Sequence, residues 1–209
     1  MNIDREQWQM VMALFIVGLL TTFLLALTDI FTHEPIAQAK RTALHSALTE
    51  VLPPYTNQPL DETLTIATPT LKDEHHLLYS ARDANGNIVG FAWETIANDG
   101  YAGSIYILMG VNSEGRMHAM RITDHKETPG LGDGITKNQP WIDHFNGQTL
   151  NTIVWGVKKD GGDFDQFTGA TITPRAVIKT LHQELLWFSQ SRQQIFKAAS
   201  TLNKEENHE

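Results

Sequence analysis

A long uncharged segment near the N-terminus constrains this chain more than any other feature. Residues 7–28 carry no charged side chain, and most of them are apolar. As a helix rising ~1.5 Å per residue, the segment would reach ~33 Å, enough to cross the hydrocarbon core of a bilayer. Trp8 stands at its start, where an interfacial aromatic residue is typical of membrane helices. Because a soluble core helix rarely runs so far without a charge, we predict a transmembrane helix over residues 8–28.

A cleaved signal peptide is the main alternative for this segment. Ala37–Ala39 has the small-x-small pattern of a cleavage site. However, the apolar stretch exceeds the usual ~7–15 residues of a signal peptide, and only Arg5 supplies positive charge before it. An uncleaved anchor is therefore favoured. Lys40 and Arg41 follow the segment at some distance, so the distribution of basic residues does not decide its orientation.

Composition limits the classes of function. The chain has 209 residues with 41% hydrophobic and 19% charged residues, which is typical of a globular rather than a disordered protein. Its formal net charge of −8 argues against a nucleic-acid partner. The absence of cysteine excludes disulfides, iron–sulfur clusters and thiolate zinc sites within this chain. A redox role would therefore need an organic cofactor or a metal held by histidine.

The segment after the anchor is predicted to lead into a helix. After Pro35, apolar residues recur on one helical face up to Val51, and Pro53-Pro54 should end that helix. The acidic C-terminal end is predicted to be frayed. The expected organisation is a short tail (1–7), a transmembrane helix (8–28), a linker and amphipathic helix (29–55), a main domain (56–198) and a flexible acidic tail (199–209).

The main domain is predicted to be α+β, an antiparallel sheet with packed helices. Asn85-Gly86 is a strong hairpin signal, and Ser113-Glu114-Gly115 predicts a second turn. The strands expected around these turns cover residues 77–79, 88–96, 104–111 and 117–122.

The second half of the chain is predicted to contain a loop, two helices and a further strand. Residues 124–137 are too rich in glycine for regular structure. Trp141–Phe145 suggests a helical turn, and Thr152–Val157 suggests a strand. A last helix should run from Pro174 to about Gln194, because its apolar residues follow a 3.6 period.

The start of that last helix is where the chemistry is expected. If Pro174 is the first helical residue, Thr173 is the natural N-cap. The free amides of a helix N-terminus attract phosphate, and Gly169-Ala170 would let the backbone approach a ligand. Thr171 is then preferred over Thr173 for esterification, because the Thr173 oxygen would be occupied by capping. A plain strand-to-helix turn with a threonine cap explains the same residues without any ligand.

Three motifs resemble a known family. Asp165-x-x-Thr168-Gly169-Ala170-Thr171 resembles the motif modified by ApbE-type flavin transferases. Glu127-Thr128-Pro129-Gly130-Leu131-Gly132 and Gly100-Tyr101-Ala102-Gly103-Ser104-Ile105 resemble elements of the FMN-binding domain shared by Rnf-type complexes and Na+-translocating quinone reductases. Together with the single N-terminal helix and Lys158–Gly162, they make the chain similar to the G-subunit family of Rnf (Rsx) ion-translocating electron transport complexes.

The resemblance implies a cofactor and a location for it. FMN would be attached covalently, through a phosphoester to Thr171. The other residues implied or inferred near it are Thr168, Gly169, Ala170, Thr173, Glu127, Thr128, Leu131, Tyr101 and, from charge and spacing, Lys158. The protein would be an electron-transfer subunit that is not catalytic alone. Its partners would be other membrane subunits and, during maturation, the flavin transferase. It would lie in a bacterial inner membrane with its domain on the periplasmic side.

Other interpretations are weaker. The nine histidines show no ligand spacing, so we predict no metal site, and no side-chain acid or base stands out as catalytic. The glycines of residues 130–134 match neither a dinucleotide-binding fingerprint nor a P-loop. Two rival functions remain: a membrane-tethered module that grips a phosphorylated ligand without redox role, and a structural subunit without cofactor.

Overall fold

The computed structural model describes residues 5–67 and 75–206, and the chain divides into two compact units. The first unit extends to His45 and the second begins at Ser46. Helix α1 (Arg5–Val51) contains the described residues of the first unit and the first residues of the second. It is long and apolar enough to cross a membrane. It ends directly before Leu52 and the proline pair, as predicted.

Helix α1 is continuous over residues for which a linker and a separate amphipathic helix (29–55) were expected. A proline in a helix interior lacks an amide donor and normally kinks or ends the helix. Pro35 instead lies inside the continuous helix. Side-chain hydrogen bonds form within the helix close to Pro35. Thr32 Oγ1 donates to the Thr28 carbonyl at 2.8 Å, and Gln38 Nε2 donates to Glu34 Oε1 at 3.1 Å.

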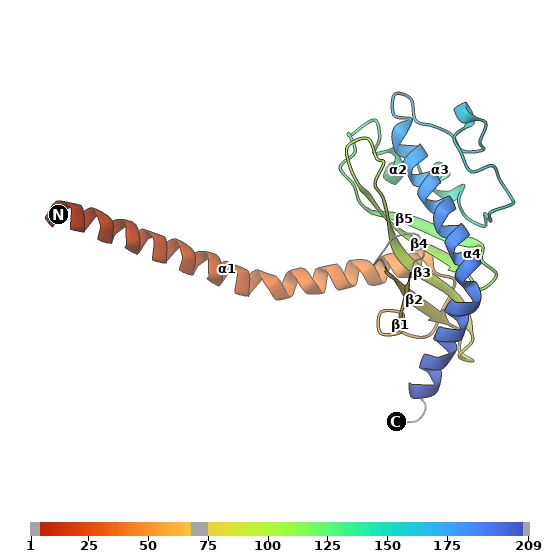
Figure 1. Ribbon diagram of the computed structural model, residues 1–209, viewed down its shortest axis with the longest axis horizontal. Coiled ribbons are helices and arrows are strands. Elements are labelled where there is room, and N and C mark those ends of the chain that lie inside the picture. The colour runs from red at the N-terminus through yellow and green to blue at the C-terminus, as the bar shows by residue number, and fades with distance from the viewer. Residues whose placement is uncertain (1–4, 68–74, 207–209) are drawn as a thin grey trace. The chain divides into compact units, whose positions relative to one another are not determined.

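The second unit is built on a five-stranded antiparallel sheet in the order β1-β2-β3-β4-β5 (Figure 1). Its strands are β1 (Thr63–Ala67), β2 (His75–Arg82), β3 (Ile88–Ala97), β4 (Ile105–Asn112) and β5 (Met117–Asp124). The prediction of an antiparallel sheet with helices is confirmed, including the turn at Gly86, where a φ of 79° suits glycine. Strand β1 was not predicted.

One face of the sheet is covered by helix α4 (Ile172–Glu206), which runs across it in Figure 1. Trp93 and Thr95 of β3 both donate to the Glu184 carboxylate of α4, at 2.9 and 2.8 Å. Trp93 also stacks on Phe188, and both rings are buried. These contacts fix α4 along the sheet, so the position of its N-terminal end is set by the core.

The predicted bounds of α4 are wrong at both ends. The helix begins at Ile172 rather than Pro174, and it continues to Glu206 rather than ending near Gln194. Residues 199–206, expected to be a flexible tail, are therefore helical. Ala199 is buried, and its carbonyl accepts a hydrogen bond from Arg82 Nη2 at 2.8 Å. The last residues, 207–209, lie outside the described residues.

The region between β5 and α4 is mostly irregular. It contains α2 (Gly134–Lys137), the expected turn α3 (Gln139–Asp143) and the 3-10 helix η1 (Lys158–Asp160). The strand predicted at residues 152–157 does not form; Val157 makes only an isolated bridge to Phe164. The physical reason is packing, because Trp155 of this segment joins an aromatic cluster. The centroid of its ring lies 5.6 Å from that of Phe164 and 5.5 Å from that of His182.

The opposite face of the sheet receives the end of α1. Val51 is fully buried there, and its carbonyl lies so close to Gly110 that an added Cβ would sit 1.9 Å from the oxygen. Glu50 forms an ion pair with Arg121 of β5 at 2.6 Å.

We predict that Gly110→Ala destabilises the protein by ~1–3 kcal/mol or more, because the added methyl must displace the Val51 backbone. Unfolding of the full-length protein in detergent, followed by tryptophan fluorescence, would measure the loss. Gly156→Ala is the matched control, since its Cβ would make only ordinary contacts of 3.6 Å or more. Equal stability of the two variants would contradict the close approach of Val51.

Candidate functional site

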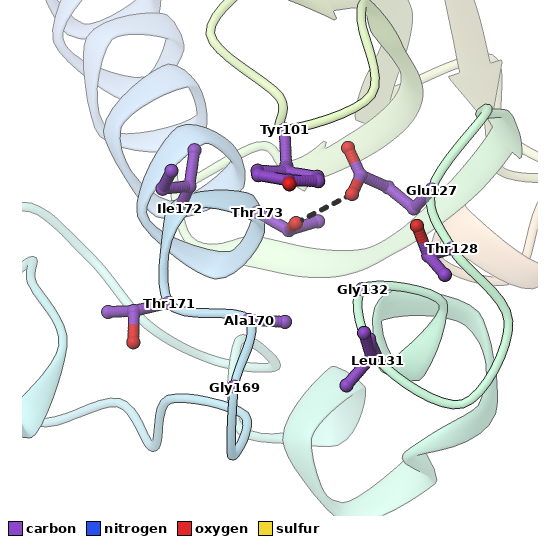
Figure 2. Close-up of a pocket in the computed structure, with 10 residues that line it drawn as sticks. All are labelled: Tyr101, Glu127, Thr128, Leu131, Gly132, Gly169, Ala170, Thr171, Ile172 and Thr173. Carbon is purple, nitrogen blue, oxygen red and sulfur yellow. Dashed lines mark hydrogen bonds between the residues drawn. The ribbon is translucent and has the colours of Figure 1, made fainter.

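A cavity of about 210 Å³ lies beside the N-terminal end of α4 (Figure 2). Three segments far apart in the sequence line it: the β3–β4 loop, the loop after β5, and the turn into α4. The lining residues are Tyr101, Glu127, Thr128, Leu131, Gly132, Gly169, Ala170, Thr171, Ile172 and Thr173. Eight of the ten site residues expected from the sequence therefore meet at one cavity.

Glu127 ties the three segments together. Its side chain is buried, with the residue only 5% exposed. Thr173 Oγ1 donates to one carboxylate oxygen at 2.8 Å, and the Ala102 amide donates to the other at 3.1 Å. The first of these bonds is the dashed line in Figure 2. Both oxygens of this carboxylate are thus satisfied within the protein, as a buried charged group requires.

Two glycines make room for this carboxylate. A Cβ on Gly132 would lie 2.4 Å from a Glu127 oxygen and 2.9 Å from Thr173 Oγ1. A Cβ on Gly100 would lie 3.0 Å from the other Glu127 oxygen and 2.2 Å from the Gly103 carbonyl. Glycine is therefore needed at both positions because of close packing, and its conformational freedom is not the reason.

The loop after β5 is held by a second acid. Asp133 accepts from the Gly130 amide at 2.8 Å and from Lys137 Nζ at 2.5 Å. The Lys137 ammonium, followed by the Gly130 amide, holds the pKa of Asp133 below its usual value despite burial. Asp133 contributes to stability above the pKa of an unfolded aspartate, and this contribution is lost as the pH falls through the lowered folded value.

The N-terminus of α4 differs from the sequence prediction in a way that matters for the site. The Thr171 carbonyl accepts the first helical hydrogen bond, from the Arg175 amide at 3.3 Å, so Thr171 is the N-cap residue. Thr173 lies inside the first turn, fully buried, and its hydroxyl binds Glu127 instead of capping the helix. The predicted partner of Thr173 is therefore wrong, although its hydroxyl is indeed occupied.

Thr171 offers a free hydroxyl at this position. Within the described part of the chain, its hydroxyl makes no hydrogen bond, and its side chain is partly exposed. In Figure 2 it points away from the Thr173–Glu127 pair. The amides of Thr171, Ile172 and Thr173 also lack partners among the described residues, and Pro174 has no amide hydrogen. These amides can therefore donate hydrogen bonds to an anion at the positive end of α4.

The turn before Thr171 is shaped by its glycine. Gly169 has a φ of 76°, a conformation that other residues rarely adopt. The Ala170 amide donates to the Phe167 carbonyl at 3.0 Å and closes the turn. Trp141 was not predicted as a site residue. Its indole N–H donates to the carbonyl of Asp165, in the segment before this turn, at 2.9 Å. Thr168 is exposed and does not line the cavity.

Lys158 also does not line the cavity. Its ammonium pairs with Asp165 at 2.8 Å, and both side chains are more than half exposed. A second pair joins Asp160 of η1 to Arg175 of α4, with bonds of 2.5 and 2.7 Å. The Arg175 guanidinium lowers the pKa of Asp160. A direct role of Lys158 at a phosphate stays a prediction. The two ion pairs connect η1 with the residues on either side of the turn that precedes Thr171.

Gly132 and Ile172 line the cavity but were not predicted as site residues. Gly132 is the last residue of the Glu127–Gly132 motif, so its place in the cavity lining could have been predicted from the sequence. Ile172 carried no such signal, because its position depends on where α4 begins. Among the residues that the structure describes, no group of histidines and acids could hold a metal ion.

Comparison with known proteins places both parts of the chain in families. Residues 100–185 match the FMN-binding domain family, and residues 8–51 match the RnfG N-terminal region. The G subunit of the ion-translocating oxidoreductase complex of Pseudomonas aeruginosa is 43% identical over 180 residues, covering 82% of this chain and 84% of that protein. The protein of the same name from Photorhabdus laumondii is 42% identical, over 83% of this chain and 86% of that protein. The one from Vibrio parahaemolyticus is 41% identical, over 84% of this chain and 86% of that protein. A crystal structure of Shewanella oneidensis NqrC matches with a TM-score of 0.43 and 22% sequence identity. The match covers 60% of this chain and 66% of that chain.

The fold and the site define a protein with an N-terminal helix capable of spanning a membrane and an FMN-binding domain. The chain belongs to the G-subunit family of ion-translocating oxidoreductase complexes.

The residues of the cavity fit FMN. The free amides at the N-terminus of α4 suit its phosphate. Tyr101, Leu131 and Ile172 line the same cavity and are 70%, 46% and 48% exposed, so apolar surface is available for the flavin ring. The volume is below the ~300–1,000 Å³ typical of sites that enclose a ligand of this size. The fit therefore predicts that part of the flavin stays outside the cavity.

We predict that Thr173→Val lowers the free energy of unfolding by ~1–3 kcal/mol, because a buried Glu127 oxygen loses its donor. Thr171→Val should stay close to wild type, since the Thr171 hydroxyl has no partner to lose among the described residues. Denaturant unfolding of the full-length protein in detergent would compare the two. A similar loss for both variants would show that the Thr173–Glu127 bond is not what stabilises the site.

Proposed function

We propose that this chain is a membrane-anchored electron-transfer subunit that carries FMN, within a complex that couples electron transfer to ion translocation. Membership of the G-subunit family and the match to the FMN-binding domain support this function. The observation that carries it is the cavity at the N-terminus of α4, where unpaired amides, exposed apolar side chains and a free threonine hydroxyl lie together.

The flavin is attached covalently, through a phosphoester to Thr171. The Thr171 oxygen forms a bond to the FMN phosphorus of FAD, the bond from that phosphorus to AMP breaks, and the hydroxyl proton passes to solvent. A flavin transferase supplies this step. Thr171 is favoured over its neighbours because its hydroxyl is unpaired, whereas that of Thr173 is buried and bonded to Glu127. Thr168 is free as well, but it does not line the cavity.

Once attached, FMN supplies the redox chemistry, and the protein supplies position and electrostatics. The amides at the N-terminus of α4 hold the phosphate. Tyr101, Leu131 and Ile172 keep water from one side of the ring, and Glu127 fixes the two loops on which Tyr101 and Leu131 stand. Because the cavity encloses only part of the flavin, the exposed part is accessible to a redox partner. Those partners are other membrane subunits of the complex.

We expect a yellow fluorescent band in denaturing gels when the full chain is co-expressed with a flavin transferase. Thr171→Ala should abolish this band, because no other hydroxyl in the cavity is both free and near the helix N-terminus. Thr168→Ala, which also removes a motif threonine, should retain the ester as the matched control. In-gel fluorescence and the mass of the intact protein would measure both.

Each other outcome identifies an alternative. A colourless wild-type band despite an active transferase would contradict covalent attachment. Flavin that is lost on denaturation would indicate non-covalent binding. Phosphate binding without any flavin would favour a module that grips a phosphorylated ligand.

We further propose that α1 anchors the chain in the bacterial inner membrane as a single span, with its domain in the periplasm. A reporter enzyme active only in the periplasm, fused after residue 206, should be active. A reporter active only in the cytoplasm should be inactive at that position. The reverse pattern would place the FMN domain on the cytoplasmic side.

A further inference from the structure

Glu127 combines burial with a lack of a cationic partner. A buried carboxylate usually pairs with a cation, since desolvating an unpaired charge is costly. Glu127 is 5% exposed, and among the described residues it makes no ion pair; its partners are one hydroxyl and one backbone amide. Both partners donate, and both carboxylate oxygens accept, which is the hydrogen-bonding pattern of an ionised group.

Of the described residues, Glu127 is the only charged one that lines the cavity, and three cations of the neighbouring segments pair with other acids. Lys137 pairs with Asp133, Lys158 with Asp165, and Arg175 with Asp160. The net charge of each pair is close to zero, so each pair contributes little electrostatic potential in the cavity. Lys126, the residue before Glu127, is exposed and forms no ion pair with it among the described residues. The nearest compensation for Glu127 is the partial positive end of α4, worth roughly half a charge. A net negative charge is therefore left in the cavity wall.

This charge is also rigidly placed. Gly132 and Gly100 pack against its two oxygens so closely that neither position admits a Cβ without displacement. The carboxylate thus has little room to rotate away from the cavity or to reach bulk water. In a partly buried site, such a charge acts through a lower effective dielectric constant than in water.

We infer that Glu127 is a positioning and tuning residue whose fixed negative charge lowers the reduction potential of the flavin in this cavity. This inference rests on the proposed function, because it requires FMN in the cavity. Adding an electron to a group beside a negative charge is unfavourable, and nearby charge is one of the means by which a protein sets a cofactor potential. The carboxylate thereby favours electron donation by the reduced cofactor.

The test is Glu127→Gln in the full-length, flavin-loaded protein. Glutamine has nearly the same shape; its oxygen can accept from the Ala102 amide and its nitrogen can donate to Thr173 Oγ1. The substitution thus removes the charge and keeps both contacts. We expect the equilibrium constant for the first one-electron reduction to rise at least tenfold, which is ~59 mV in midpoint potential. A spectroelectrochemical titration in detergent measures this shift.

Two controls separate charge from structure. Glu114→Gln removes a carboxylate in the turn between β4 and β5, which pairs with Arg116 and is 70% exposed. The potential should not change. Thr173→Val removes a donor to Glu127 and keeps its charge, so the potential should stay or fall. A rise in Thr173→Val equal to that in Glu127→Gln would attribute the effect to disturbed packing and overturn the inference.

The remaining outcomes are also decisive. An unchanged potential in Glu127→Gln with its flavin in place would overturn the inference and leave the proposed function intact. Failure of Glu127→Gln to hold FMN, where Glu127→Asp holds it, would show that the charge serves assembly rather than potential. Absence of flavin from the wild-type protein would instead contradict the proposed function itself.

Discussion

The hydrogen bonds of the Glu127 carboxylate are the interaction on which the site depends. They connect Ala102 in the β3–β4 loop, Glu127 after β5, and Thr173 in α4. None of these segments is close to another in sequence, and two of them are loops that could adopt other conformations alone. A buried carboxylate without these donors would be costly, so the protein gains stability only when all three segments are in place.

The sheet provides the rigid support for this arrangement. Helix α4 is fixed along the sheet by Trp93, Phe188 and the bonds to Glu184, and its N-terminal end then reaches the two loops. The free amides at that end exist because the preceding turn leads into the helix without a side-chain cap. An anion site and an apolar surface therefore share one cavity, which is the combination that a phosphorylated flavin requires.

Much of the fold could be read from local patterns. The apolar anchor, the hairpin at Gly86 and the period of α4 depend on neighbouring residues only, and each was predicted. Pro35 lies inside a continuous helix, for which the contacts of the described residues give no reason. The other failures had non-local causes. The residues around Trp155 pack on aromatic partners instead of forming a strand. The C-terminal residues remain helical because Ala199 is buried against the sheet and bonded to Arg82.

The sequence alone predicted eight of the ten residues that line the cavity, because motifs of glycine, threonine and glutamate are visible without coordinates. It also predicted a phosphate group as a ligand near residue 171. Only the tertiary structure decided what each residue does. Thr173 binds Glu127 and Thr171 is the N-cap with a free hydroxyl, because the first residue of α4 is set by contacts between distant segments. Such contacts depend on three-dimensional packing, and spacing along the chain does not encode them.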